Sequence, residues 1–331
     1  MTKKTANLKG VFPAIVTPFY EDGRIDLLGL QSNIAIWNSK GVKGYLVLGS
    51  TGEVAHLDRG EKLAVLEAAR AAIPPEYPMI VGTGVHSTQA TIAFTKRAAE
   101  IGASYALVVT PHYFKRDMTD KVLRAYFEAV AEASTIPVLI YNVPQFTGIN
   151  MSAELIATLA RHPNIVGVKD SSGDMKTLIK LLGMVVDKDF AVLTGSALVL
   201  YPSLMVGAAG AILAVANFAA EACIEIYELV REEIGLEWEV PAENQQVRIM
   251  KAISGKYASR KRAMKLQEQL LVITETVIGC SGIGGIKYAM NCLGYCGGYV
   301  REPLVMPDET MKAAIRSVMK ATLFPNLVLE E

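Results

Sequence analysis

The chain has 331 residues, of which 51% are hydrophobic, so it can bury a sizeable core. Its 33 basic and 33 acidic side chains balance, which argues against a protein that binds nucleic acid or an anionic membrane surface. The four cysteines form no C-x-x-C pair, and the basic N-terminus is not followed by the apolar h-region of a signal peptide. We therefore expect a cytoplasmic protein with free thiols and without a secretory leader.

Eight short apolar runs recur along the first 215 residues, and helical stretches with an apolar 3.6-residue period lie between them. Eight such units predict an α/β fold, a (β/α)8 TIM barrel of parallel strands ringed by helices. The alternative, an open doubly wound sheet, normally has a glycine-rich phosphate loop after its first strand, whereas Thr17-Pro18-Phe19-Tyr20 follows here. N-capping residues at Asp58, Ser87, Ser152 and Ser196 support four helix starts. The predicted strands are residues 11–18, 44–48, 79–82, 103–110, 137–142, 165–169, 190–194 and 211–215.

One stretch, residues 190–220, contains no charged side chain and is long enough to suggest a membrane span. Thr194-Gly195-Ser196 and Tyr201-Pro202 interrupt it, and strands of a parallel sheet are buried on both faces and give such apolar runs. We therefore interpret it as two barrel strands with a short helix between them, and we expect no membrane partner.

The β signal stops after about residue 218. We predict that residues 1–220 form the barrel and that residues 221–331 form its last helix and a helical C-terminal extension. The predicted helices of this second part are residues 221–235, 242–254, 257–277, 285–292 and 307–320.

The most informative side chain is Lys169, at the end of the apolar run that begins at Ile165. The preceding run, from Val138, ends in the phenol of Tyr141. Active sites of barrels form where the strands end, so this amine and this phenol should meet over one pocket. Burial favours the neutral, nucleophilic amine, and a phenol can move protons. A lysine at a strand end in solvent and a tyrosine at the barrel rim are the alternatives.

Other strand ends carry further candidates. The Gly49-Ser50-Thr51-Gly52 turn has backbone N–H groups and two hydroxyls that can hold a carboxylate, although it also fits an ordinary βα turn. Tyr113 can extend a hydroxyl relay or pack at an interface. Ser171 and Gly195 follow two later strands. The four histidines are scattered without carboxylate partners at ligand spacing, so we expect no metal.

Four motifs in this combination resemble one family. They are residues 49–53 (GSTGE), 109–113 (VTPHY), 141–144 (YNVP) and 168–174 (VKDSSGD). The chain resembles the dihydrodipicolinate synthase / N-acetylneuraminate lyase superfamily of class I, pyruvate-handling aldolases, from about Gly10 to Leu304.

The resemblance implies a cofactor-free lyase in which Lys169 forms an imine with pyruvate and Tyr141 transfers protons. It implies that Ser50 and Thr51, beside Gly49, bind the carboxylate and relay protons. It also implies a homotetramer built of dimers, in which Tyr113 reaches into the neighbouring subunit. Pocket-lining contacts are expected from Ser171, Gly195, Ile212 and Phe146.

One departure concerns the second substrate, an aldehyde. Dihydrodipicolinate synthases usually carry an arginine where this chain has Phe146, and a phenyl ring cannot bind a carboxylate in a bidentate manner. Residues 162–171 and 294–304 are similar to the 4-hydroxy-2-oxoglutarate aldolase branch, which is the interpretation we favour. The alternatives are 4-hydroxy-tetrahydrodipicolinate synthase, which uses aspartate semialdehyde, and a non-catalytic 2-oxo acid sensor.

Overall fold

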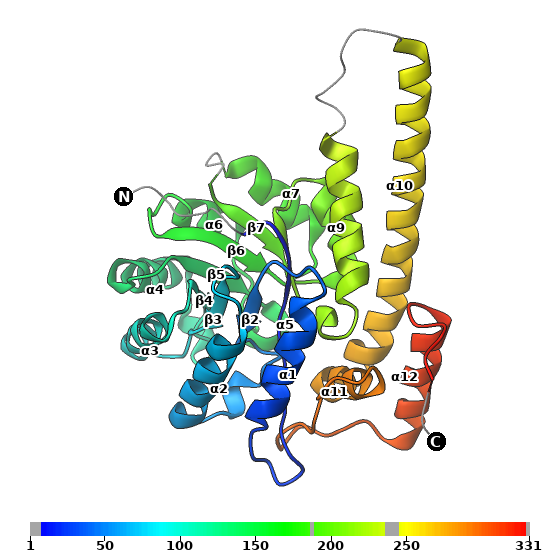
Figure 1. Ribbon diagram of the computed structural model, residues 1–331. Coiled ribbons are helices and arrows are strands. Elements are labelled where there is room, and N and C mark those ends of the chain that lie inside the picture. Colours follow the sequence, from blue (N-terminus) through cyan, green and yellow to red (C-terminus); the bar gives the residue numbers. More distant parts are fainter. Residues whose placement is uncertain (1–7, 186–188, 236–244, 329–331) are drawn as a thin grey trace.

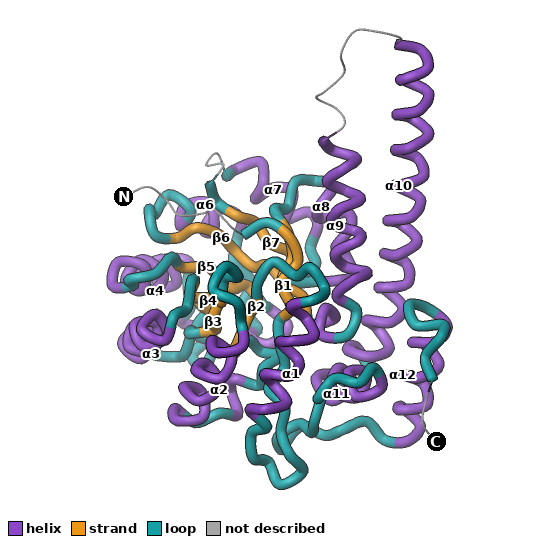
Figure 2. Tube along the Cα trace, in the orientation of Figure 1, coloured by secondary structure: helices purple, strands orange, loops and turns teal. Residues whose placement is uncertain are grey.

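The computed structural model describes residues 8–185, 189–235 and 245–328. Within them, eight parallel strands form one sheet in the order β1-β8-β7-β6-β5-β4-β3-β2. The parallel bridge between Ala14 and Leu46 joins β1 to β2, so the sheet closes into the predicted barrel (Figures 1 and 2). The strands are β1 (Gly10–Pro13), β2 (Tyr45–Val47), β3 (Met79–Gly82), β4 (Tyr105–Val109), β5 (Val138–Asn142), β6 (Ile165–Asp170), β7 (Ala191–Thr194) and β8 (Gly210–Leu213).

Alternate strand residues divide the core into two shells. One set, with Phe12, Leu139, Leu193 and Ile212 among its members, packs together inside the barrel. The other set, for example Ile140, packs against the surrounding helices. Because side chains alternate along a strand, this division decides which strand-end residues face the barrel axis.

Helices follow each strand and cover the barrel. Asp58 caps α2 in a capping box, and Ser87 and Ser152 accept hydrogen bonds at the starts of α3 and α6, as predicted. The cap predicted at Ser196 is wrong: a 3₁₀ turn, η3 (Ala197–Val199), begins there without a side-chain cap bond. The helices of this part are α1 (Leu27–Asn38), α2 (Arg59–Ala72), α3 (Thr88–Ile101), α4 (Asp120–Ala133), α5 (Pro144–Thr147), α6 (Ala153–Leu159), α7 (Met175–Met184), α8 (Leu200–Met205) and α9 (Ala220–Gly235).

The C-terminal extension is helical, as predicted. It contains α10 (Gln245–Thr274), α11 (Gly282–Cys292) and α12 (Glu309–Ala321), and α10 runs beside α9 and projects past the barrel (Figure 1). The predicted break after residue 254 is wrong, because α10 continues through it. A glycine inside a helix costs only about 1 kcal/mol relative to alanine and need not end the helix. The predicted start at residues 242–244 lies outside the described residues. The division at residue 220 stays a prediction.

A separate finding concerns membrane spans. In the parts of the chain that the structure describes, no single helix combines the length and the apolar composition that a crossing requires; the bent pair Tyr257–Gly279 and Gly282–Cys292 (117°) does so only as a pair.

Candidate active site

The amine and the phenol predicted to meet do lie together. Tyr141 and Lys169 are register partners on the neighbouring strands β5 and β6. The Lys169 Nζ atom lies 4.4 Å from the centroid of the Tyr141 ring. Both side chains are deeply buried, with 4% of Lys169 and 6% of Tyr141 exposed. An amine in this place is shielded from water and has a phenol as its immediate neighbour.

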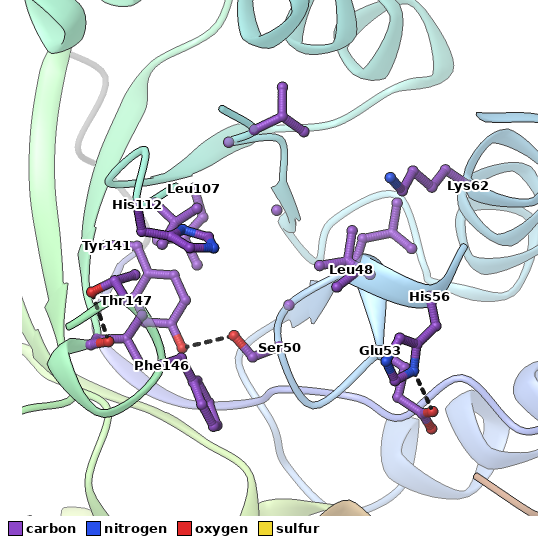
Figure 3. Close-up of a pocket in the computed structure, with 18 of the residues that line it drawn as sticks. Leu48, Ser50, Glu53, His56, Lys62, Leu107, His112, Tyr141, Phe146 and Thr147 are labelled. Carbon is purple, nitrogen blue, oxygen red and sulfur yellow. Dashed lines mark hydrogen bonds and ion pairs between the residues drawn. The ribbon is translucent and has the colours of Figure 1, made fainter. Parts of the chain in front are cut away.

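The hydroxyl of Ser50 connects this pair to the turn after β2. Ser50 Oγ and Tyr141 Oη are 3.4 Å apart, a weak hydrogen bond that is longer than is usual between two hydroxyl groups (Figure 3). The turn is compact, since the Gly52 and Glu53 amides donate to the carbonyls of Gly49 and Ser50. Thr51 lies part-buried in the same turn. The Ser50 hydroxyl, which we predicted to bind the carboxylate of the 2-oxo acid, therefore lies next to the Tyr141 hydroxyl.

Small residues leave room for the stem of Lys169. A Cβ atom on Gly195, which follows β7, would lie 2.9 Å from Lys169 Cε and 2.0 Å from Ser171 Oγ. Ser171 is itself buried, and its amide donates to the Asn142 carbonyl. Gly195, Ser171 and Lys169 therefore form one packed group, and a side chain at position 195 would displace Ser171 and Lys169.

Two further predicted positions differ in their surroundings. Ile212, on β8, is fully buried in the barrel interior and belongs to the same core cluster as Tyr141. Phe146, in α5, is 67% exposed and lines the pocket described next.

A pocket of about 520 Å³ opens beside Tyr141. Of the predicted residues, Gly49, Ser50, Tyr141 and Phe146 line it, and so does His112 (Figure 3). The remaining walls are mainly apolar and include Leu48, Val54, Val85, Leu107, Val109, Val143, Ile283 and Leu304. Leu304 and Ile283 show that the C-terminal extension supplies part of the wall.

Three further polar residues of the pocket wall, His56, Lys62 and His86, were not predicted from the sequence. Burial lowers the pKa of Lys62 below its ordinary value. Burial, and then the nearby His112, lower the pKa of His86. The rings of His86 and His112 meet edge to face with centroids 4.5 Å apart. His56 lies in the 3₁₀ turn Val54–His56 and Lys62 in α2, beyond the strand ends, whereas His86 lies in the loop between β3 and α3, which the strand-end rule could have indicated.

Tyr113 is not part of this group within one chain. It is 74% exposed, and its ring contacts Phe114 and His86. Among the described residues, no hydrogen bond joins it to Ser50 or Tyr141. Its predicted role in a neighbouring subunit stays a prediction.

A second buried lysine lies below the turn. Lys287 Nζ is 2.6 Å from Glu53 Oε1, and neither side chain has exposed surface. The signal for burial was present, because Lys287 stands four residues after Ile283 in an otherwise apolar helix. As to metals, the residues described contain no cluster of three or more His, Cys, Asp or Glu side chains that could bind one.

With this geometry established, similarity to known proteins is informative. A model of the dihydrodipicolinate synthetase family matches residues 7–239. The chain belongs to this family. A protein of Methanosphaerula palustris named 4-hydroxy-tetrahydrodipicolinate synthase is 34% identical over 313 residues, which cover 94% of this chain and 98% of the relative. A protein of the same name from Neisseria gonorrhoeae is 33% identical over 95% of this chain and 99% of its own length.

Solved structures of the family have the same fold. YagE, a prophage protein from E. coli K12 solved in complex with pyruvate, superimposes with a TM-score of 0.82 at 28% identity, over 96% of this chain and 99% of its own. A dihydrodipicolinate synthase from Acinetobacter baumannii, also complexed with pyruvate, superimposes with a TM-score of 0.82 at 28% identity, over 95% of this chain and 98% of its own. The family member described here is thus a TIM-barrel enzyme, a carbon–carbon lyase of the class I aldolase type.

Proposed function

We propose that the chain forms an imine between Lys169 and pyruvate, and uses it to make or cleave a carbon–carbon bond. The observation that carries the proposal is the buried Lys169 amine 4.4 Å from the Tyr141 ring, with the Tyr141 hydroxyl beside Ser50. Relatives solved with pyruvate support the choice of 2-oxo acid. No cofactor takes part in the proposed chemistry.

The steps follow from these positions. The Lys169 nitrogen attacks C2 of pyruvate, and a proton moves to the oxygen to give a carbinolamine. Tyr141 and Ser50 transfer the protons that let this oxygen leave as water, which produces a protonated imine. The carboxylate is held by the Ser50 and Thr51 hydroxyls and by backbone amides of their turn.

The protonated imine then accepts electrons from C3. Loss of a C3 proton gives an enamine that adds to an aldehyde; in reverse, a 4-hydroxy-2-oxo acid is cleaved to pyruvate and an aldehyde. Covalent attachment makes this carbon–carbon step effectively unimolecular, which can lower the barrier by several kcal/mol.

For the aldehyde, we favour glyoxylate, which forms with pyruvate when 4-hydroxy-2-oxoglutarate is cleaved, over aspartate semialdehyde. Phe146 lines the pocket but offers no hydrogen bond to an acidic group. Lys115, in the 3₁₀ turn Lys115–Asp117, lies next to Gly148 at the end of α5, where it can meet an anion. The second candidate, 4-hydroxy-tetrahydrodipicolinate synthase, is supported by the name that the cited curated relatives share.

We further propose that a second copy of the chain completes the relay. The 74% exposed Tyr113 ring has no hydroxyl partner of its own within the described residues, which suits a residue that acts in a neighbouring subunit. A homotetramer of dimers in the cytoplasm is the assembly we propose. Mixing Lys169→Ala with Tyr113→Phe chains tests it, since mixed oligomers should regain activity that neither variant has alone.

The test of the substrate is a rate assay with pyruvate and a panel of aldehydes: glyoxylate, aspartate semialdehyde, N-acetylmannosamine and sugar-derived aldehydes. We expect the fastest turnover with glyoxylate, or with 4-hydroxy-2-oxoglutarate in the cleavage direction. Faster turnover of aspartate semialdehyde would favour the synthase. No turnover of any member would contradict both.

A further inference from the structure

The ammonium group of Lys287 lies among three oxygen atoms beneath the turn of residues 49–53. It contacts Glu53 Oε1 at 2.6 Å and donates to the carbonyls of Thr17 at 2.7 Å and Tyr299 at 2.5 Å. The Phe19 ring lies against it, with the centroid 4.4 Å from Nζ. This one group therefore joins the end of β1, the turn after β2 and the C-terminal segment.

The turn that Lys287 holds is a strained one. Leu48 and Glu53 flank it, and both have positive φ angles, 57° and 53°, although neither is glycine. Such conformations cost about 1–3 kcal/mol each and persist only where surrounding contacts impose them. The contacts here include the hydrogen bond from Thr17 Oγ1 to the Gly52 carbonyl, at 2.7 Å. Lys287 donates a hydrogen bond to the carbonyl of the same Thr17 and forms an ion pair with Glu53, at the end of the turn.

The other carboxylate oxygen of Glu53 is occupied as well. Glu53 Oε2 accepts the Arg301 amide at 3.0 Å and lies 3.3 Å from His56 Nδ1. The Arg301 guanidinium, in turn, binds Glu61 in a bidentate manner at 2.7 and 2.8 Å. Lys287 therefore contacts one oxygen of Glu53, and the Arg301 amide binds the other. Glu53 is the last residue of the turn that contains Ser50 and Thr51.

We propose that Lys287 is a positioning residue for the carboxylate site: its pairing with Glu53 fixes the turn and so sets where Ser50 and Thr51 meet the carboxylate of the 2-oxo acid. This inference rests on the proposed function. A buried ion pair need not stabilise a fold overall, because desolvation opposes the attraction, so a structural role alone is a poor explanation for it. The ion pair between Lys287 and Glu53 is explained better if it holds the turn of residues 49–53 in one conformation.

The charge on Lys287 should then control pyruvate binding. Glu53 and Arg301 face its ammonium, with His56 and Glu61 behind them. Burial lowers the pKa of Lys287 to about 8, although Glu53 opposes this shift. Above that pH the amine loses its charge and Glu53 loses its ionic partner. The wild-type turn should then behave like that of a variant without the ammonium.

The experiment measures how much pyruvate half-saturates covalent trapping by cyanoborohydride, which needs no aldehyde. For Lys287→Met near pH 7 we expect this concentration to rise about tenfold, equivalent to roughly 1.4 kcal/mol of binding, with little change in the maximal trapping rate. The ratio of variant to wild type should fall toward one near pH 9.5. The matched control is Lys312→Met, which removes a surface lysine paired with Glu309 in the same extension and should change neither quantity.

A second variant guards against a folding defect. Lys287→Met/Glu53→Gln removes both charges, so no buried carboxylate is left unpaired, and its half-saturating concentration should stay raised even where its thermal stability matches wild type. Unchanged half-saturation in a folded variant, or a ratio that does not vary with pH, overturns the role of Lys287. If wild type itself traps no pyruvate on Lys169, the proposed function fails, whatever the Lys287 variants do.

Discussion

Replacing Gly195 by alanine should damage the site while leaving the backbone able to fold. The added Cβ would lie 2.0 Å from Ser171 Oγ and 2.9 Å from Lys169 Cε, whereas real contacts of this kind are hardly ever shorter than 3.0 Å. The Ser171 hydroxyl must therefore move by about 1 Å, and the Lys169 stem must shift to accommodate the methyl group. Overpacking of this kind costs about 1–3 kcal/mol of stability.

The effect on chemistry should be measurable apart from the effect on folding. The shift of about 1 Å falls on Ser171, whereas Lys169 Cε must move by only a few tenths of an ångström. Because a misplacement of 1 Å can cost on the order of 100-fold in rate, we expect the smaller shift of Lys169 to lower the rate of pyruvate trapping on Gly195→Ala roughly tenfold. Circular dichroism melts alongside the trapping assay separate the two effects.

The chain provides a matched control at Gly183, a position in α7 with no atom within 4 Å of an added Cβ. Gly183→Ala should keep full activity and gain about 0.5–1 kcal/mol from the better helix former. The steric reasoning is refuted if Gly195→Ala reacts with pyruvate as fast as wild type, or if both alanine variants lose activity equally.

Three further predictions concern separate parts of the molecule. Tyr141→Phe should retain pyruvate binding but lose about 100- to 10,000-fold in turnover, measured by steady-state kinetics, because the proton-transfer group is gone. Phe146→Arg should lower KM for aspartate semialdehyde at least about tenfold through a new bidentate carboxylate contact. Hydrogen bonds from Arg301 hold the pKa of Glu61 below its ordinary value. Glu61 therefore stabilises the fold above pH about 4.5, and the urea midpoints of wild type and Glu61→Gln should converge as the pH falls below it.

Each of these three has a contradicting outcome. Near-normal turnover of Tyr141→Phe would remove the phenol from the proposed mechanism. An unchanged KM in Phe146→Arg would mean that α5 does not face the aldehyde. A constant difference between wild type and Glu61→Gln at all pH values would mean that the carboxylate charge is not what Arg301 stabilises.

The barrel was predictable because its determinants are local. Buried parallel strands leave apolar runs such as the one ending at Lys169. Side chains at the ends of neighbouring parallel strands converge, so the sequence alone was enough to place Tyr141 beside Lys169. The alternation of strand residues then explains why both face the barrel interior.

What escaped prediction depends on contacts between distant parts of the chain. Glu53 and Lys287 pair across most of the sequence, and no local pattern links them. His56 and Lys62 reach the pocket from a 3₁₀ turn and a helix whose path follows from tertiary packing. The cap predicted at Ser196 failed because a 3₁₀ turn, and not the predicted α-helix, begins there.

The most direct measurement is to reduce the protein with borohydride in the presence of pyruvate and to locate the modified residue by peptide mass spectrometry. We expect one adduct, on Lys169, that disappears in Lys169→Ala and persists in Lys287→Met. An adduct on Lys62 or Lys287, or one that forms equally in Lys169→Ala, would show that a different amine carries the chemistry.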